Sequence, residues 1–260
     1  MKKEPLVSCL CVSEDRPDYL RKAISCFNAQ TYVKKELILV SRLYDPEYEE
    51  IVSGVTGGEV KYYSLEDKTR FFKLGGMRNY SIAQSSGELF CIWDDDDWHH
   101  PMRLEKMVQG ILEGKKSGTI LPYCLLFDKV NGDVYLSPPT FMHPSSIMVR
   151  RDLMGQQDFY KNENHEDLYF RNTLVGKGAL YPVVAPQLYI YVYHAANLCN
   201  SEHFNKIFGL SSKLRPEFGR MIGDVVNHKY SCEEAVALLN ESDLLNELDY
   251  FPGLWWPSVE

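Results

Sequence analysis

The sequence predicts an α/β protein in which a mixed, mostly parallel β-sheet is flanked by helices and followed by a helical C-terminal extension. Apolar runs of strand length alternate with amphipathic helical patterns over the first 115 residues. Short strands and a hairpin signal follow as far as residue 198, and helical patterns dominate from about residue 200. Such alternation gives a doubly wound sheet, which binds its ligands at the carboxyl ends of its strands.

In the first 115 residues, compact apolar runs predict strands over 6–13, 35–41, 59–65 and 87–94. Helices are expected between them because apolar residues recur on one face and prolines stand near the first turns. The expected helices cover 16–30, a short stretch from Pro46, 75–86 and 101–114.

The pattern changes after residue 115. Residues 119–136 predict a hairpin that turns around Asn131-Gly132. Further strands are expected over 145–151, 179–184 and 188–194, and helices over 165–176, 201–210, 215–228 and 231–248. We therefore predict one α/β domain over 1–198, with halves 1–115 and 116–198, and a helical extension over 199–260.

Composition narrows the class of protein. The chain has 260 residues, of which 45% are hydrophobic and 25% charged, as in ordinary soluble globular proteins. A formal net charge of -8 argues against nucleic acid as a partner. The seven cysteines are scattered without C-x-x-C pairs, which favours reduced, buried thiols in a cytoplasmic protein. The first residues do not fit a signal peptide, and no transmembrane segment is expected.

The stretch CIWDDDDWHHP, residues 91–101, sets four carboxylates directly behind an apolar run. If strand geometry continues through it, Asp94 and Asp96 lie on one face and Asp95 and Asp97 on the other. A carboxylate pair at a strand end suits Mg²⁺ or Mn²⁺, which in turn binds a diphosphate. A solvated acidic turn before the helix at Pro101 explains these residues equally well.

Several stretches occur in an order that resembles the family 2 glycosyltransferases of the GT-A fold, over roughly residues 5–195. They are the N-terminal strand and helix, GGMRNYSIAQSSGELFCIWDDDDWHHP, HPSSIMVRRDL and HEDLYF. The resemblance implies a metal-dependent, inverting enzyme that moves a sugar from a nucleotide-diphosphate sugar to an acceptor hydroxyl. Residues 1–115 would then bind the donor, and residues 116–198 would bind the acceptor and carry the catalytic base.

Matched by position, Asp94-x-Asp96 corresponds to the family's D-x-D motif, with Asp96 as metal ligand and Asp94 toward the metal or the donor ribose. Asp95 falls within the same donor site. The metal, Mn²⁺ or Mg²⁺, offsets charge on the diphosphate leaving group. HEDLYF matches the family's E-D element and makes Asp167 the general base, with Glu166 beside it. On the residues alone, the pair is better explained as charges that favour a helix N-terminus.

Further positions follow from the resemblance. Arg78, beside Asn79, is expected near the diphosphate, with a surface arginine as the alternative. The nucleotide pocket would take Ser13, Asp15 and Arg16, although Asp15 also suits a helix cap before Pro17. His194, which precedes Asn197 and Asn200, would complete the metal site or touch the diphosphate, or else be structural. We expect His99 and His100 in a loop at the donor mouth without a role, and His143 on the acceptor side.

The donor and the acceptor are less defined. Ser13-Glu14 and Ser41-Arg42 replace the residues with which the family reads the base, so a UDP-sugar is the default and GDP, CMP and dTDP donors stay open. A glycan, a lipid-linked sugar or another hydroxyl compound would serve as acceptor. Tyr250, Phe251, Trp255 and Trp256 suit a lid, a homo-oligomer contact, an acceptor platform or a tail packed on the core.

Two other functions remain as alternatives. A nucleotidyltransferase would also use carboxylate-held metal on an α/β domain, but the first strand is not followed by a glycine-rich loop with a lysine. A non-catalytic module that binds sugar nucleotides or glycans would explain the altered base-reading positions. The intact carboxylates argue against it.

Overall fold

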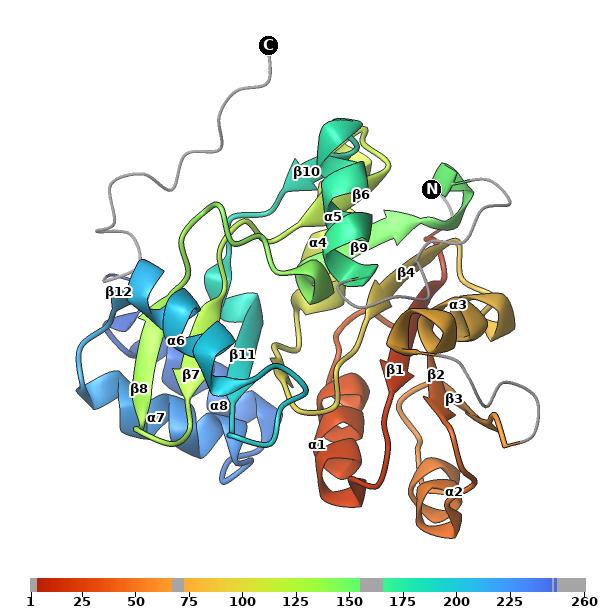
Figure 1. The fold of residues 1–260 in the computed structure, drawn as a ribbon, viewed down its shortest axis with the longest axis horizontal. Helices are drawn as coiled ribbons and strands as arrows, with labels where there is room; N and C mark the ends of the chain where they lie inside the picture. Colours follow the sequence, from red (N-terminus) through yellow and green to blue (C-terminus); the bar gives the residue numbers. More distant parts are fainter. Residues whose placement is uncertain (1–3, 67–72, 155–165, 245, 247–260) are drawn as a thin grey trace.

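The protein is described here by a computed structural model, which covers residues 4–66, 73–154, 166–244 and 246. These residues form two β-sheets with helices around them (Figure 1). The larger sheet contains β1 (Val7–Val12), β2 (Lys35–Ser41), β3 (Glu59–Ser64), β4 (Leu89–Ile92), β6 (Gly118–Ile120), β9 (Ile147–Arg150) and β10 (Leu180–Pro182). The smaller sheet contains β5 (Trp98–His99), β7 (Leu125–Asp128), β8 (Asp133–Leu136), β11 (Tyr189–Tyr193) and β12 (Ser212–Lys213).

The larger sheet has seven described strands in the order β10-β6-β9-β4-β1-β2-β3. Neighbouring strands are parallel except that β9 runs antiparallel to both β4 and β6. The predicted mixed, mostly parallel sheet is therefore confirmed.

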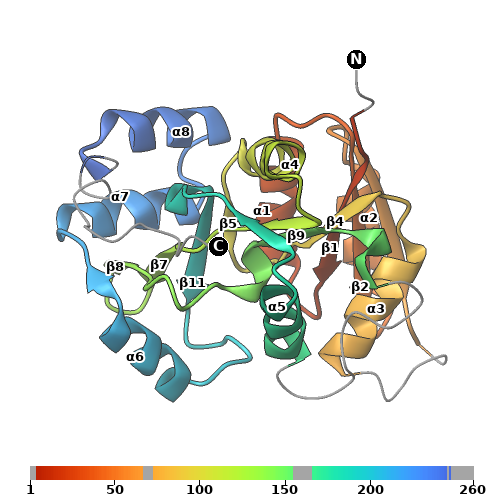
Figure 2. The same cartoon turned by 90° about the horizontal axis from the view of Figure 1, so that it is seen from above.

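Helices cover both faces of this sheet. They are α1 (Pro17–Asn28), α2 (Pro46–Ser53), α3 (Leu74–Gln84), α4 (Arg103–Gly114) and α5 (Glu166–Gly176). Because side chains alternate along a strand, Cys9 and Cys11 of β1 pack in the same core as α1, α2 and α4, whereas Leu10 packs with α3 and α5. Figure 2 shows α1 and α4 on one side of β1, β4 and β9, and α3 and α5 on the other.

The smaller sheet has the order β12-β8-β7-β11-β5. The predicted hairpin is present: β7 and β8 pair through Asp128 and Asp133, and Gly132 takes the left-handed φ of 75° that the turn requires. The stretch before it splits at Pro122, so that β6 joins the larger sheet and β7 the smaller one.

The C-terminal helices enclose the smaller sheet. They are α6 (Ser201–Leu210), α7 (Glu217–Val226) and α8 (Cys232–Glu241). Three short 3-10 helices lie earlier in the chain: η1 (Pro144–Ser146), η2 (Arg151–Met154) and η3 (Pro186–Leu188). Phe218 and Ile222 of α7 and Leu239 of α8 share the main hydrophobic core with Phe127 of β7. Ile207 of α6 belongs to a separate cluster. The described part of the predicted extension thus packs against the α/β core.

Candidate active site

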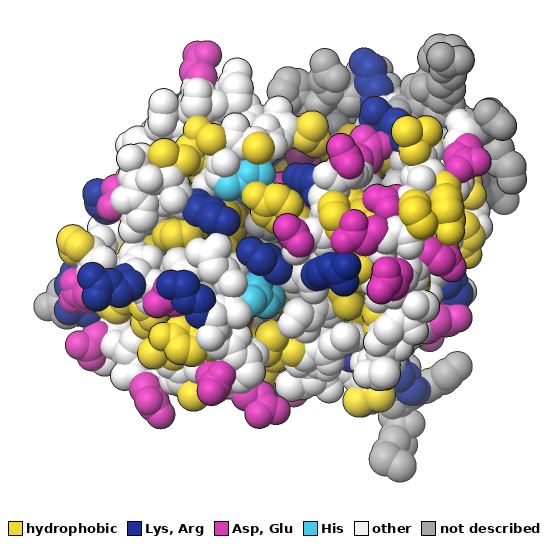
Figure 3. All heavy atoms as spheres, turned by 90° about the horizontal axis from the view of Figure 1, so that it is seen from below, with side chains coloured by type: hydrophobic (Ala, Val, Ile, Leu, Met, Phe, Trp, Pro, Cys, Tyr) yellow, Lys and Arg dark blue, Asp and Glu magenta, His cyan; other side chains and the backbone are white. Residues whose placement is uncertain are grey.

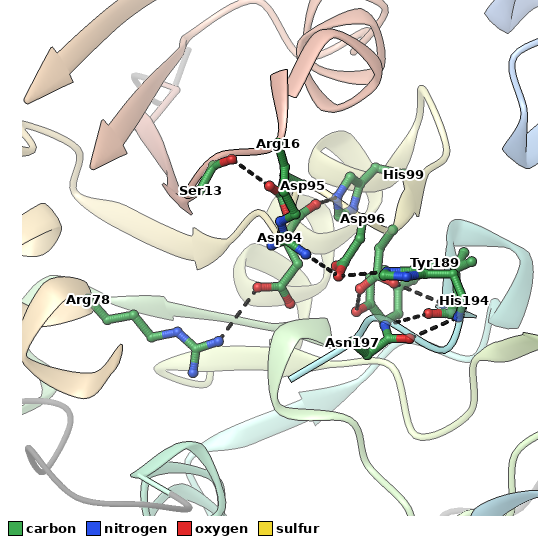
Figure 4. A network of polar contacts seen from close by, with 12 residues as sticks. Ser13, Arg16, Arg78, Asp94, Asp95, Asp96, His99, Tyr189, His194 and Asn197 are labelled. Atoms are coloured by element: carbon green, nitrogen blue, oxygen red, sulfur yellow. Dashed lines mark hydrogen bonds and ion pairs between the residues drawn. The ribbon is translucent and has the colours of Figure 1, made fainter. Parts of the chain in front are cut away.

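The four aspartates lie in the turn that joins β4 of the larger sheet to β5 of the smaller one. The chain leaves extended conformation after Ile92 and turns at Asp95 and Asp96. The predicted alternation of faces is therefore wrong, because the chain must bend here to cross from one sheet to the other. Each carboxylate instead meets its own set of partners (Figure 4).

Arg16, at the start of α1, bridges two of these carboxylates. Its Nη2 lies 2.6 Å from Asp95 Oδ1, and its Nη1 lies 3.0 Å from Asp96 Oδ2. The Ser13 hydroxyl donates a 2.5 Å hydrogen bond to Asp95 Oδ2. Since Ser13 and Arg16 follow β1, the predicted donor-site residues at the end of this strand do meet the acidic turn.

His194 approaches the turn from the other sheet, immediately after β11. Its Nε2 lies 3.2 Å from Asp96 Oδ2, and its ring is tilted against that of Tyr19, with centroids 5.0 Å apart. Asn197 holds the strand end, because its Oδ1 accepts a 2.8 Å hydrogen bond from His194 N and its Nδ2 donates to Val192 O. His194 Nδ1 is buried and has no hydrogen-bond partner within the described residues.

Asp94 has its own partners. Its Oδ1 lies 3.5 Å from Nη2 of Arg78, which projects from α3. The charge of Arg78 and the neighbouring Ser145 of η1 act to lower the pKa of Asp94, against the larger effect of burial. Arg78 is only 6% exposed, so it is not a surface arginine, and its place near the diphosphate stays a prediction.

Asp97 anchors the turn to the smaller sheet. Its carboxylate accepts hydrogen bonds from the hydroxyl of Tyr189 and, at 2.9 Å, from the backbone N–H of Val192. Asp95 and Asp97 are buried, with 2% and 4% exposure, which excludes a freely solvated acidic turn.

Burial and mutual repulsion change the pKa values of this cluster. Burial, followed by the charge of Asp96, raises the pKa of Asp95 to about 7. Burial also raises the pKa values of Asp94 and Asp97. It acts in the same direction on Asp96, but the hydrogen bond from His194 and the charge of Arg16 hold the pKa of that carboxyl below its usual value. A cation at the turn would relieve the repulsion among these groups.

A cavity of about 630 Å³ opens at the ends of β1, β2 and β3. Its lining includes Asp15, Arg42, Tyr44 and Glu66. Asp15 is exposed with a φ of 54°, and α1 is preceded by Arg16 without a side-chain cap bond, so the reading of Asp15 as the helix cap is wrong.

Tyr48 connects this cavity to the acidic turn, and sequence reasoning missed it. Its hydroxyl lies 2.7 Å from Ser13 Oγ and accepts a 3.0 Å hydrogen bond from the backbone N–H of Arg16. Ser13 in turn binds Asp95. A tyrosine within a short helix carries no signal of such a contact.

Asp167 lies in the first turn of α5, where its Oδ1 accepts a 2.7 Å hydrogen bond from the Leu168 N–H. The helix is fastened to η1, because Arg171 donates a 2.8 Å hydrogen bond to Phe141 O and α5 packs on η1. The side chain of Glu166 lies outside the described residues, as does the aromatic stretch 250–256.

His99, His100 and His143 pack inside the molecule. His99 lies in β5 and His100 directly follows it, and both are buried, so they are not exposed at the donor mouth as expected. The ring of His99 stacks on Trp93 and contacts Arg103, which is also fully buried. His143 accepts a 3.3 Å hydrogen bond from Ser145 N, and burial lowers the pKa of His143 to about 3.

The residues present fit a divalent cation in part. Within the described ranges, no three His, Cys, Asp or Glu side chains form a ready-made ligand cluster. Mg²⁺ and Mn²⁺ are often held by one or two carboxylates, with phosphate oxygens and waters as the other ligands. Asp94, Asp96 and Nε2 of His194, which faces Asp96, are the groups at the turn that suit such an arrangement.

Comparison with known proteins decides the family. The family described as Glycosyl transferase family 2 matches residues 10–180. This chain belongs to glycosyltransferase family 2. Curated relatives agree: an uncharacterized glycosyltransferase of Rickettsia typhi is 28% identical over 137 residues, which cover 52% of this chain and 41% of the relative. One from Rickettsia felis is 28% identical over 148 residues, 56% of this chain and 24% of the relative. The family 2 chain thus spans less than half of these relatives.

Solved structures show that this family 2 protein has the GT-A fold. S. aureus TarS 1-349 in complex with UDP-GlcNAc superposes with a TM-score of 0.58 and 14% identity, covering 94% of this chain and 78% of TarS 1-349. The mannosyltransferase PcManGT from Pyrobaculum calidifontis, in complex with GDP-Man and Mn²⁺, gives a TM-score of 0.58 at 12% identity. The match covers 92% of this chain and 75% of PcManGT.

Among the described residues, no helix is both long and apolar enough to cross a membrane.

Proposed function

We propose that this chain transfers a sugar from a nucleotide-diphosphate sugar to an acceptor hydroxyl with inversion at the anomeric carbon, in the presence of Mn²⁺ or Mg²⁺. The observation that carries the proposal is the convergence of Arg16, Arg78 and His194 on the acidic turn. Three basic side chains from different elements surround Asp94 and Asp96, so the turn can hold a cation and a diphosphate together.

The nucleotide would occupy the cavity beside Ser13, Asp15 and Tyr48. This position lies at the carboxyl ends of parallel strands, where α/β proteins bind such ligands. Figure 3 looks onto the side of the molecule where β1 ends in Figure 1, and Lys and Arg side chains form a band across the middle of this face. A local band of cations favours an anionic donor despite the net charge of -8.

Asp94, Asp96 and His194 would hold the metal, which when bound offsets the charge of the departing diphosphate. Arg16 lies against Asp96, and its planar guanidinium has the geometry to pair with phosphate oxygens. Arg78 would bind the diphosphate from the side of Asp94.

Asp167, with Glu166 next to it, would take the proton of the acceptor hydroxyl as its oxygen attacks the sugar. Its position on a helix that is fastened to η1 supports this role, because Ser145 of η1 neighbours Asp94. An inverting transfer needs one carboxylate on the acceptor side and no covalent intermediate. The acceptor would be a glycan, a lipid-linked sugar or another hydroxyl compound.

The proposal is tested by a screen of UDP-, GDP-, dTDP- and CMP-sugars with and without Mn²⁺, read by thermal shift and by hydrolysis products. We expect one donor to stabilise the protein only with metal and to release a nucleoside diphosphate, or the monophosphate from a CMP-sugar. Asp96→Ala should lose both effects. Release of pyrophosphate would indicate nucleotidyl transfer, and metal-dependent binding without turnover on any acceptor would indicate a binding module. No metal-dependent response would reject the site.

A further inference from the structure

An ion pair beyond the ends of β1 and β2 has no part in the acidic turn. Glu14 lies just after β1 and Arg42 directly follows β2, and both line the cavity of about 630 Å³. Arg42 Nε and the Arg42 backbone N each lie 3.3 Å from Glu14 Oε1. Within the described contacts, Glu14 Oε2 and the two terminal nitrogens of Arg42 have no partner. The contacts are long and the side chains of Glu14 and Arg42 are 40% and 52% exposed, so the pair adds little stability and is open to a ligand.

Several other polar side chains around this cavity are already bound within the protein. Ser41 Oγ donates a 2.5 Å hydrogen bond to Leu43 O. Asp45 Oδ1 accepts a 2.8 Å hydrogen bond within the first turn of α2, and the Tyr48 hydroxyl is bound on the side of the acidic turn. Carboxylates and the Arg42 guanidinium are therefore the charged groups that remain for a ligand in this cavity.

The cavity also offers an aromatic surface. Tyr44 lines it, is 51% exposed and stacks on Tyr62 with ring centroids 6.1 Å apart. Because Tyr62 supports one side of the Tyr44 ring, that ring presents a fixed surface to a planar ligand. Glu14 is also adjacent to Ser13, whose hydroxyl binds Asp95. A base bound by Glu14 would thus have its phosphates on the side of the acidic turn.

We propose that Glu14 and Arg42 select a guanine base, so that the sugar donor is a GDP-sugar; this inference rests on the proposed function. Guanine presents two adjacent N–H groups, at N1 and at the N2 amino group, and one carboxylate can accept from both. Its O6 and N7 are neighbouring acceptors, to which arginine donates two hydrogen bonds. Uracil, cytosine and adenine have no two adjacent N–H groups on the base edge, so they leave part of the ion pair unmatched.

The pairing of the two charges is what gives this selectivity. Asp15 and Glu66 line the same cavity, but neither has a cation beside it among the described residues. A lone carboxylate would accept a hydrogen bond from the amino group of adenine or cytosine as well. Glu14 and Arg42 together require two donors and an acceptor side by side, and a site built for such bonds rejects ligands that lack them.

The test is calorimetric titration of the full-length chain in Mn²⁺ with GDP, IDP, ADP, UDP and CDP. We expect GDP to bind at least about 10-fold more tightly than ADP, UDP and CDP. IDP keeps O6 and N7 but lacks the N2 amino group, so it should bind more weakly than GDP and more tightly than the other three. Equal or tighter binding of UDP, CDP or ADP would overturn guanine selection alone. Absence of metal-dependent binding by every nucleotide would reject the proposed function with it.

Variants assign the selectivity to the pair. Glu14→Gln offers one acceptor and one donor, so GDP affinity should fall by about 5- to 100-fold. The same variant should gain affinity for xanthosine diphosphate, which carries a carbonyl in place of the N2 amino group. Arg42→Gln should weaken GDP and IDP by the same factor, because both keep O6 and N7. An unchanged ratio of GDP to UDP affinity in Glu14→Gln would contradict the proposal.

Glu47→Gln is the matched control. Glu47 of α2 forms an exposed ion pair with Arg21, whose Nη2 lies 2.9 Å from Glu47 Oε1, and neither residue is part of the cavity lining. The variant removes the same charge from a similar surface pair, so it should leave all five nucleotide affinities unchanged. A loss of GDP affinity equal to that of Glu14→Gln would show a general effect of charge and would overturn the proposal.

Discussion

His194 Nε2 lies 3.2 Å from Asp96 Oδ2, although the two residues are 98 positions apart in the sequence. The contact joins the end of β11, in the smaller sheet, to the turn that leaves the larger sheet. The imidazole is held in place by Tyr19 and by the Asn197 contacts, and its Nδ1 faces no described partner. The geometry suits a residue that completes a binding site from the opposite side.

Replacement of this histidine should weaken metal binding more than it harms the fold. We expect His194→Ala to raise the Mn²⁺ concentration needed for half-maximal activity by about 10- to 100-fold, the usual cost of losing a group at or next to a metal. Saturating Mn²⁺ should restore much of the rate. Activity titrations over Mn²⁺ concentration check this, with His203→Gln as a control on the exposed surface. An unchanged Mn²⁺ requirement would make His194 purely structural.

Asp167→Asn should abolish transfer and leave donor binding intact. The amide keeps the size of the side chain and still accepts the hydrogen bond from the Leu168 N–H, but it cannot take a proton. We expect the turnover rate to fall by about 10²- to 10⁴-fold, the usual contribution of a general base. Calorimetric titration with donor and Mn²⁺ should give an unchanged affinity. Full turnover in this variant would move the base elsewhere.

Asp97 is expected to matter for stability through its link to β11. In Asp97→Asn an amide N–H₂ replaces one acceptor oxygen, so either Tyr189 or Val192 loses its bond to a buried carboxylate. We expect the free energy of unfolding to fall by about 1–3 kcal/mol. Tyr189→Phe removes a single one of these bonds and should cost less. Chemical denaturation of both variants gives the comparison, and equal stability of wild type and Asp97→Asn would contradict it.

Stability should fall at mildly acidic pH because of buried histidines such as His100. Burial lowers the pKa of His100 from 6.5 to about 4, and its Nδ1 accepts a 3.0 Å hydrogen bond from Met102 N. Between these two pH values the unfolded chain binds a proton that the folded protein does not. The folded state therefore loses stability as the pH falls through this window, by at most about 3 kcal/mol from this residue.

His100→Asn separates this titration from packing. Asn keeps an acceptor for the Met102 N–H and does not titrate, so its unfolding free energy should change less between pH 7 and pH 4 than that of the wild type. Urea denaturation at several pH values measures the slope. The same slope in both proteins would show that other groups dominate.

Tyr48→Phe tests the connection between the cavity and the acidic turn. Loss of the hydroxyl leaves Ser13 Oγ and the Arg16 N–H without their shared partner. We expect the KM for the donor to rise by about 5- to 10-fold, which corresponds to roughly one lost hydrogen bond, with a smaller change in kcat. Tyr230→Phe, on an exposed tyrosine, is the control. A change in kcat alone would assign Tyr48 a different role.

The sequence predicted the α/β architecture well because its strongest signals are local. The runs at 6–13 and 35–41 became β1 and β2, and the amphipathic pattern from Pro17 became α1. Predictions failed where long-range packing decides the conformation. The acidic stretch turns to reach a second sheet, and the adjacent His99, in β5, and His100 are buried in the core.

Some residues of the candidate site were predicted from the sequence, and others were found only in the structure. The positions Asp94, Asp96 and Arg78 were predicted from the family resemblance, and the structure places Arg78 against Asp94. Tyr48, Tyr189 and Arg103 were missed, since each acts through a partner on a distant element. Nothing in a single sequence marks a tyrosine that will meet an aspartate from another part of the chain.

The acidic turn, which joins β4 to β5, is one of the chain's crossings between the two sheets. A donor and cation bound at this turn would contact residues of both sheets. Binding energy at such a junction opposes any motion that separates the sheets. Bound ligand would therefore make the two sheets unfold more cooperatively and would raise their melting temperature. The sharpness of the unfolding transition would then report how much of the donor site is occupied.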